Sequence, residues 1–178
     1  MSAKDAVAIL QGAFGARILE AVPEPPPPTK EAAGIRDPYV RIAARDLVEV
    51  ATFLRDEPRL RFDLLSCLTA VDYPKESRIQ LVYALCSVPL KHTLALRVDL
   101  PRSAPRAPTL ERVYRAADWH EREAYDLMGV LFEGHHNLAR ILCAEDWEGH
   151  PLRKDYAMPA SYHGIPNAFG TFFDTQNP

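Results

Sequence analysis

Histidine and acidic side chains gather between residues 119 and 156, where their spacing first suggests a metal or acid–base site. His120 and Glu123 are three positions apart, so on a helix they would share one face, as metal ligands often do. His150 is a third possible ligand in the same segment. The zinc-protease motif HExxH is absent, because the second histidine is missing after His120 and Glu121. A metal-dependent hydrolase using His120, Glu123 and His150 is therefore a remote alternative, which metal analysis of the purified chain would test.

Two other pairs of side chains in this segment fit such a site poorly. Glu121 and Glu123 are two positions apart, and residues at that spacing do not face each other on a helix. His135 and His136 are adjacent, so in an extended chain their rings would point in opposite directions. We therefore predict that the chain carries no catalytic residue and no ligand to a metal or cofactor.

The same segment has the composition of a protein interface. It holds both tryptophans, and Trp, Tyr and Arg dominate the energetics of interfaces. Its charges are either salt links on the surface and between subdomains, or anchors for docking several partners, and we favour docking. Arg122 and Arg153 sit among acids, where forked pairing with carboxylates is available. The predicted partner-binding residues are Trp119, His120, Glu121, Arg122, Glu123, Tyr125, Asp126, Arg140, Glu145, Asp146, Trp147, His150, Pro151, Arg153, Lys154, Asp155 and Tyr156.

Hydrophobic periodicity predicts the elements that position this segment. Apolar residues at helical spacing indicate helices over residues 6–13 and 47–54, closed by Gly15 and Pro58. Short strands are predicted at 17–22 and 38–43, and residues 60–73 contain a run typical of a buried strand. Apolar and polar residues alternate over 79–85 and again over 92–100, which indicates two half-buried strands. A short link makes these two strands antiparallel neighbours.

Local signals also predict helices just before and within the histidine-rich segment. Thr109 is expected to cap a short helix over residues 110–116. Asp118 is expected to cap the next helix in a capping box with Glu121, and Gly129 to end it. The fold class is therefore α+β, with two layers: helices packed on a mixed or antiparallel sheet. We predict a core domain at residues 1–129 and an irregular, extended partner-docking segment at 130–178.

Composition excludes several classes of function. The net charge is −3, so there is no broad basic excess with which to bind nucleic acid. The apolar run at residues 64–71 is far shorter than the roughly 20 residues of a membrane-spanning helix. Three widely spaced cysteines form neither a disulfide framework nor a metal knuckle. The 8 glycines are scattered, without a phosphate-binding loop.

Several sequence elements resemble the C subunit of proton-translocating NADH–quinone oxidoreductase, respiratory complex I. Residues 119–130 read WHEREAYDLMGV and resemble the family element WHEREVYDLFGI. Residues 132–135 and 138–142 continue this likeness, and residues 145–156, EDWEGHPLRKDY, resemble the family ending EDWEGHPLRKDYP. LTAVDY at 68–73 matches a third element. The chain departs from the family at His136, where proline is usual, at residues 143–144, and by a delayed proline at Pro159.

This resemblance implies a non-catalytic subunit of the peripheral arm, in a hetero-oligomer that couples NADH-to-quinone electron transfer to proton translocation. Its direct neighbours would be the D subunit, with the quinone site, and the B subunit, with the terminal iron–sulfur cluster. FMN, iron–sulfur clusters, NADH and quinone would belong to the parent complex and not to this chain. The protein would lie peripherally on the cytoplasmic side of the bacterial inner membrane and touch it only through the complex. The alternative is the equivalent subunit of a related membrane-bound hydrogenase or other quinone-reducing complex.

Two segments outside the family-like elements have unusual composition. Residues 23–28 hold five prolines in six positions, which indicates an extended spacer or a ligand for a proline-binding domain. Residues 157–178 carry one charged side chain and four aromatic residues, at positions 162, 169, 172 and 173. We expect this tail to lay its rings on a neighbouring subunit, and the alternative is that it folds back on its own domain.

Overall fold

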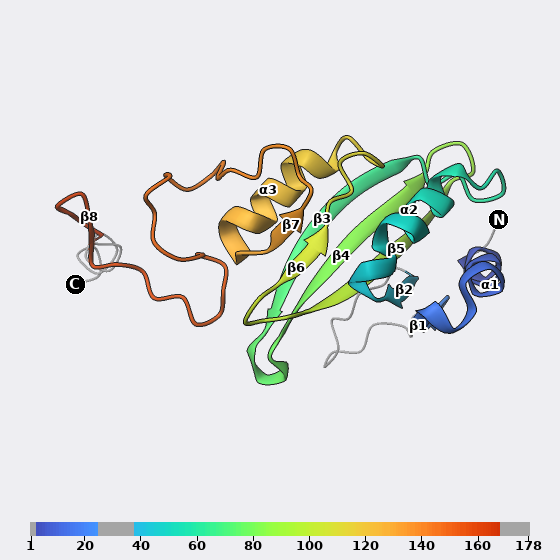
Figure 1. The fold of residues 1–178 in the computed structure, drawn as a ribbon, viewed down its shortest axis with the longest axis horizontal. Coiled ribbons are helices and arrows are strands. Elements are labelled where there is room, and N and C mark those ends of the chain that lie inside the picture. Colours follow the sequence, from blue (N-terminus) through green and yellow to red (C-terminus); the bar gives the residue numbers. More distant parts are fainter. Residues whose placement is uncertain (1–2, 25–37, 168–178) are drawn as a thin grey trace, which may run out of the picture.

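Five strands form one mixed sheet in the order β1-β2-β5-β4-β3 (Figure 1). A computed structural model describes residues 3–24 and 38–167. The strands are β1 (Ile18–Val22), β2 (Tyr39–Ile42), β3 (Leu64–Tyr73), β4 (Arg78–Ser87) and β5 (His92–Pro101). Neighbours run antiparallel except β2 and β5, which are parallel. The predicted α+β fold with a mixed sheet is confirmed.

The centre of the sheet is the pair β4 and β5. Tyr83 faces Leu96 across the two strands, and Leu81 faces Val98. All four side chains are fully buried, because the period-two alternation places them together on the face that the helices cover. The prediction of two antiparallel strands with this alternation is confirmed.

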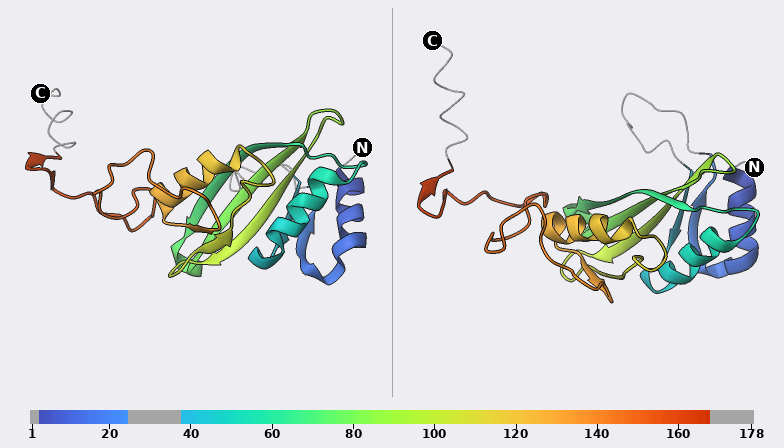
Figure 2. Two further views of the ribbon diagram at one scale, coloured as in Figure 1. Left: turned by 45° about the horizontal axis from the view of Figure 1, so that its top comes forward. Right: turned by 90° about the horizontal axis from the view of Figure 1, so that it is seen from above.

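The helices contribute their apolar faces to the same core. They are α1 (Ala3–Phe14), α2 (Leu47–Asp56) and α3 (Ala117–Met128), with 3-10 turns at Gly15–Arg17, Ala44–Asp46 and Pro74–Glu76. The two views of Figure 2 show α2 and α3 on one face of the sheet. Phe14 of α1 meets Phe53 of α2 edge to face, with ring centroids 5.2 Å apart. Among the described residues, no helix is long and apolar enough to cross a membrane.

The expectation of a buried strand within residues 60–73 is wrong for most of its length. Strand β3 lies at the edge of the sheet, and only Leu65, Leu68 and Asp72 of its ten residues are buried. The pairing of β3 with β4 shifts register between Leu65 and Cys67. An edge position explains why residues that read as apolar in sequence stay accessible, since within the described residues β3 pairs with β4 alone.

A small parallel ladder joins the core to the C-terminal part of the chain. Strand β6 (Arg106–Pro108) precedes α3 in the sequence and β7 (Leu131–Glu133) follows it, and the two strands pair in parallel. Val130 and Phe132 are buried in the same core cluster as the sheet residues. The apolar core thus continues a few residues beyond Gly129, and the domain division at that residue stays a prediction.

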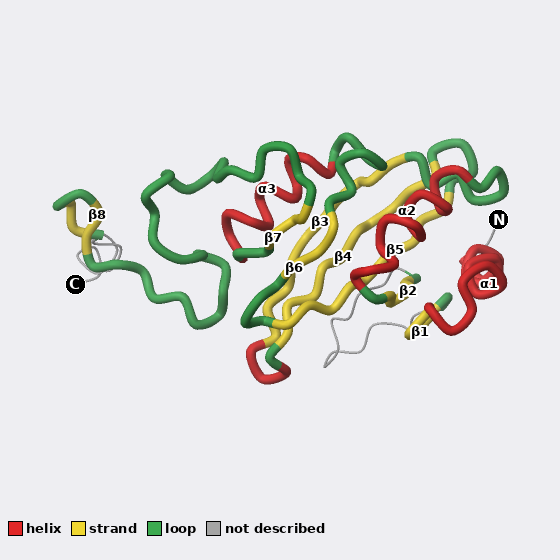
Figure 3. The backbone as a smooth tube through the Cα atoms, in the orientation of Figure 1, coloured by secondary structure: helices red, strands yellow, loops and turns green. Residues whose placement is uncertain are grey.

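From residue 134 the chain runs mainly as loop, extending away from the sheet, as the green tube in Figure 3 shows. We call residues 134–167 the extension. It ends in a short hairpin of β8 (Ser161–Tyr162) and β9 (Ile165–Pro166). Ser2, which with Asp5 has the pattern of an N-cap for the first helix, lies outside the described residues. So do most of the proline-rich run and the tail residues Phe169, Phe172 and Phe173.

Candidate functional site

Helix α3 carries the first part of the block that the sequence singled out. Its last residue is Met128, and the C-cap is Gly129, whose φ of 72° lies in the left-handed region. A Cβ on this glycine would come within 2.5 Å of the His150 ring and 2.9 Å of Arg153. The position therefore needs glycine both for its backbone angle and for the close approach of the extension.

The start of α3 differs from the prediction. The helix begins at Ala117 after the N-cap Ala116, which makes no side-chain cap. Residues 110–116 form turns rather than the predicted short helix. The predicted capping box of Asp118 and Glu121 is wrong, because the N-cap is Ala116 and the buried Glu121 carboxylate pairs with residues 109 and 110. A glutamate three residues after an N-cap candidate can reach back to the N-cap, as the capping box requires, or pack elsewhere. Here it packs against the turn that precedes α3.

Glu121 instead holds that turn against α3. Its carboxylate accepts hydrogen bonds from the Thr109 hydroxyl at 2.5 Å and from the Leu110 backbone N–H at 2.7 Å. Burial raises the pKa of Glu121 to about 7, even though the two donors favour its charged form. This carboxylate is thus a structural link between α3 and residues 109–110.

Asp126 is the second fully buried carboxylate of α3 and organises the start of the extension. Its Oδ2 accepts from the backbone N–H groups of residues 141, 142 and 143, at 3.0, 2.7 and 2.9 Å. Its Oδ1 accepts from Arg140 at 2.8 Å. Burial opposes ionisation of Asp126, but these donors outweigh it and lower the pKa to about 2. Arg140 also donates to the carbonyls of Trp147 and Gly149, at 2.9 and 3.1 Å.

The last carbonyl groups of α3 are paired with the extension rather than left to solvent. His150 Nδ1 donates to the Asp126 carbonyl at 2.9 Å, and the Leu152 N–H donates to the Leu127 carbonyl at 3.0 Å. Arg153 Nε donates to the Met128 carbonyl at 2.8 Å. A helix leaves its last four carbonyls without internal partners, and the extension supplies donors to three of them.

A further anchor joins the extension to the sheet through Asp72. This buried side chain of β3 accepts two bonds from Arg102, at 2.7 and 3.0 Å, and one from the Lys154 N–H at 2.9 Å. Arg102 also pairs with Asp155 at 2.5 Å. The Arg102 guanidinium keeps the pKa of Asp72 below its usual range. Sequence reasoning noted Asp72 only as part of LTAVDY; a lone acid in an apolar strand is the signal that indicates such an anchor.

Apolar and aromatic side chains project outward from this polar framework. Trp119 is 62% exposed at the first turn of α3, and the Arg122 guanidinium lies 5.0 Å from its ring centre. Leu142, Leu152 and Met158 of the extension are exposed as well. Arg122 donates to the Ala139 carbonyl, and Arg153 to that of Met128 as above, so forked pairing with acids is not the arrangement seen at these arginines.

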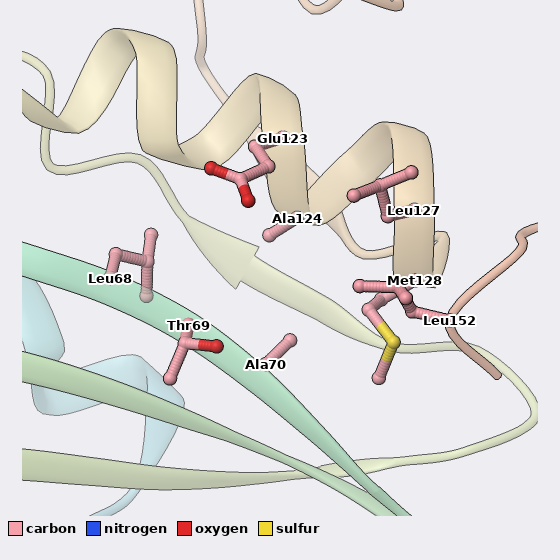
Figure 4. Close-up of a pocket in the computed structure, with 8 residues that line it drawn as sticks. All are labelled: Leu68, Thr69, Ala70, Glu123, Ala124, Leu127, Met128 and Leu152. Carbon is pink, nitrogen blue, oxygen red and sulfur yellow. The ribbon is translucent and has the colours of Figure 1, made fainter. Parts of the chain in front are cut away.

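A small cavity of about 30 Å³ lies between α3 and β3 (Figure 4). Leu68, Thr69 and Ala70 line it from the strand, and Glu123 and Met128 are among its helix residues. That volume holds a water molecule or two, and it is too small for a quinone or nucleotide. We therefore assign no substrate to this cavity.

The predicted site residues fall into three classes of exposure. The exposed ones are Trp119, Glu123, Glu145, Asp146, Lys154 and Asp155. The half-buried ones are His120, Arg122, Tyr125, Arg140, Trp147, His150, Pro151, Arg153 and Tyr156, and the buried ones are Glu121 and Asp126. His120, Glu123 and His150 are not brought together as a group of metal ligands in the described part of the chain. The role of the whole set in binding partners stays a prediction.

The described part of the tail contacts the extension itself. Tyr162 donates to Asp146 at 2.8 Å, and His163 pairs with the same carboxylate at 2.6 Å. The Tyr162 ring also lies 5.0 Å from that of Trp147. This first aromatic residue of the tail therefore packs on the extension, not on the sheet or its helices. The other three lie outside the described residues, so the choice between a neighbouring subunit and the core domain as the tail's partner stays a prediction.

Sequence comparison gives a consistent set of relatives. Residues 40–162 match the family described as respiratory-chain NADH dehydrogenase, 30 kDa subunit. The C subunit of NADH-quinone oxidoreductase from Chlorobium phaeobacteroides is 50% identical over 118 residues, which cover 66% of this chain and 71% of that protein. The corresponding protein of Chloroherpeton thalassium is 47% identical, with 65% and 48% covered. That of Roseiflexus castenholzii is 42% identical, with 82% and 83% covered. The chain thus spans about half the length of some relatives and most of others.

Solved structures show the same fold. One chain of the membrane-bound sulfane sulfur reductase, an archaeal respiratory membrane complex, is 29% identical with a TM-score of 0.66, covering 87% of this chain and 85% of that one. A trypsin-resistant fragment of Nqo5 is 26% identical with a TM-score of 0.56, covering 76% and 99%.

Proposed function

Since the chain belongs to the family of the 30 kDa subunit of respiratory-chain NADH dehydrogenase, we propose that it is a non-catalytic scaffold in the peripheral arm of an NADH–quinone oxidoreductase. The observation that carries this proposal is the family match over residues 40–162, which includes most of the sheet, α3 and most of the extension. In the complex it packs beside the D subunit, which holds the quinone site, and the B subunit, which bears the terminal cluster. It lies on the cytoplasmic side of the inner membrane.

The exposed face of α3 and the extension supports a docking role. Trp119 presents an indole and an Arg122 guanidinium together, and both groups are typical of interface anchors. The backbone that carries Leu142 is fixed by Asp126, and the backbone of Leu152 is fixed by α3. Side chains on a preorganised backbone lose less entropy on association, so this face suits a lasting contact.

The chain itself is proposed to carry no flavin, iron–sulfur cluster, nicotinamide or quinone; these belong to the parent complex. Cys67, Cys86 and Cys143 are free, and no CxxC pair occurs in the sequence to hold a cluster. The test is the optical spectrum of the purified chain together with an assay of NADH oxidation. Flavin or cluster absorption that stays with the chain would overturn this part of the proposal.

Docking is tested by the variant Trp119→Ala, with Leu19→Ala as a matched control. Both side chains are large, apolar and exposed, at 62% and 57%, but Leu19 lies on β1, away from α3. We expect both variants to fold like the wild type and only Trp119→Ala to reduce the amount of the chain retained in complexes solubilised from membranes. Equal retention of the two variants would contradict a docking role for this face.

The equivalent subunit of another respiratory complex is the second candidate function. The sulfane sulfur reductase chain aligns with 87% of this chain at a TM-score of 0.66, so this fold also occurs in a complex of different chemistry. Co-purification from solubilised membranes distinguishes the two. Flavin- and NADH-binding subunits in the isolated complex support the first candidate, and their replacement by a different electron-input module supports the second.

A further inference from the structure

Glu111, His135 and His136 meet at a point that the docking proposal does not use. One potential ligand atom from each lies within 4.8 Å of the other two. Glu111 Oε2 is 2.7 Å from His136 Nδ1 and 3.8 Å from His135 Nδ1. The His135 side chain is fully buried, Glu111 is 12% exposed, and His136 is 63% exposed. The cluster therefore has a buried floor and an open side.

The expectation that the two histidine rings point in opposite directions is wrong. Gly134 has a φ of 86°, and the chain turns there instead of continuing as an extended strand. The two rings stack, with centroids 5.3 Å apart and planes 12° apart. The turn places both rings on the side of the chain that faces Glu111.

The surroundings of His135 are those of a prepared metal ligand. Its Nδ1 accepts a hydrogen bond from the Asn137 N–H at 3.1 Å, so that nitrogen carries a lone pair. Its Nε2 lies 3.2 Å from the Asp118 carbonyl and 3.3 Å from Asp118 Oδ1. Metal-binding histidines usually donate their second ring N–H to a carboxylate or carbonyl in this way. Asp118 Oδ1 is buried and has no hydrogen bond of its own.

We propose that Glu111, His135 and His136 bind a divalent transition-metal ion of the zinc class. Two imidazole nitrogens and one carboxylate oxygen are ligands that Zn²⁺ accepts, and water from the open side completes four-coordination. The ion takes the place of the contacts that Nδ1 of His135 makes with the Asn137 N–H and that Nδ1 of His136 makes with Glu111. The ligand atoms then close around it by small movements of the exposed His136 side chain and the 134–137 turn.

The bound ion would act as a structural clip. Glu111 belongs to the turn before α3, His135 and His136 to the start of the extension, and Asp118 to the first turn of α3. A single ion thus joins the first two segments directly and α3 indirectly, through the contact of His135 with Asp118. This set differs from the hydrolase set of His120, Glu123 and His150, and no reaction is assigned to it.

The test is calorimetric titration of the full chain with Zn²⁺, followed by nitrogen–proton spectra of the histidine rings. We expect one Zn²⁺ per chain and signal changes at His135 and His136. His136→Gln and Glu111→Gln are expected to lower the affinity for Zn²⁺ about tenfold or more. Asp118→Asn, which touches the ion only through His135, is expected to lower it about 10–100-fold.

His163→Gln and His120→Gln are the matched controls. His163 is equally exposed and pairs with a carboxylate at 2.6 Å, but in the described structure it belongs to no group of three ligands. Both controls should bind Zn²⁺ like the wild type. Absence of stoichiometric binding, or equal weakening by His163→Gln and His136→Gln, would overturn the proposal. Because His136 is exposed, loss of fold does not confound its variant, and circular dichroism of each variant checks this directly.

Discussion

The sheet and the extension reach order through different interactions. In β4 and β5, apolar side chains such as Leu81 and Leu96 are removed from water, and that burial is non-directional. Between residues 139 and 155, order comes from two buried carboxylates, Asp72 and Asp126, that accept several backbone N–H groups. Such bonds are directional, so they fix a loop without regular secondary structure. The comparison shows how an irregular segment can hold a defined surface beside a conventional core.

The largest expected effect is at the hub of the extension. Asp126→Ala leaves three backbone N–H groups and Arg140 without their acceptor, which costs about 3–5 kcal/mol in a buried network. We expect the extension to open while β4 and β5 stay protected, as measured by hydrogen exchange of the amides of residues 141–143 and of the strands. Equal loss of protection in both regions would show that they form one cooperative unit.

The second prediction concerns the apolar core of the sheet instead of the extension. Leu81→Ala creates a cavity in the core and should lower the free energy of unfolding by about 2–5 kcal/mol, as read from urea denaturation. Leu142→Ala is the control, since this leucine is exposed and its loss should shift stability by no more than about 0.5 kcal/mol. If both variants lowered the free energy of unfolding by a similar amount, the exposed leucine of the extension would matter to stability as much as the buried leucine of the sheet, which contradicts the comparison.

The two buried carboxylates of α3, Glu121 and Asp126, affect stability with opposite dependence on pH. Its folded pKa of about 7 lies above the ordinary 4.5, so its contribution to stability is fully present below pH 4.5 and is lost as pH rises through 7. Glu111 and Asp118 add repulsion in the same direction, beyond the effect of burial. Asp126, with its pKa of about 2, contributes stability that is lost only as pH falls below its ordinary value of 3.8 toward 2.

We therefore expect Glu121→Gln to stabilise the chain at pH 8 by on the order of 1–3 kcal/mol and to have little effect at pH 4.5. The amide of glutamine keeps one acceptor for Leu110 and gains a donor for Thr109, so the shape of the site is preserved. Urea unfolding at the two pH values measures the difference. A variant that is less stable than the wild type at pH 8 would show that the charged carboxylate is the form the fold requires.

The smallest expected effect concerns one neutral hydrogen bond within the extension. Trp147 Nε1 donates to the Tyr156 hydroxyl at 2.9 Å, and Trp147→Phe removes this donor while keeping most of the ring. Such a bond contributes about 0.5–1.5 kcal/mol, so the extension should exchange only slightly faster. If the amides of Trp147→Phe exchanged as fast as those of Asp126→Ala, the aromatic residues and not the buried carboxylates would be the main groups that hold the extension in place.

Sequence reasoning succeeded where one physical rule decides the structure. Alternation identified β4 and β5, and Gly129 identified the end of α3, because both signals are local. It failed at Glu121 and at the two adjacent histidines, where tertiary packing and the turn at Gly134 choose among several local options. Burial of Asp126 was also not foreseen, since an acid on a helix usually faces water.

The bond from the Lys154 N–H to Asp72 joins residues that are 82 positions apart in the chain. During synthesis the sheet and α3 are complete before this partner leaves the ribosome, so Asp72 and Arg102 first pair with each other on a domain that is already folded. The extension then docks last, over a long loop closure whose entropy slows its formation. By the same argument it opens before the sheet, so within the described residues we expect proteases to cleave the extension sooner than the core.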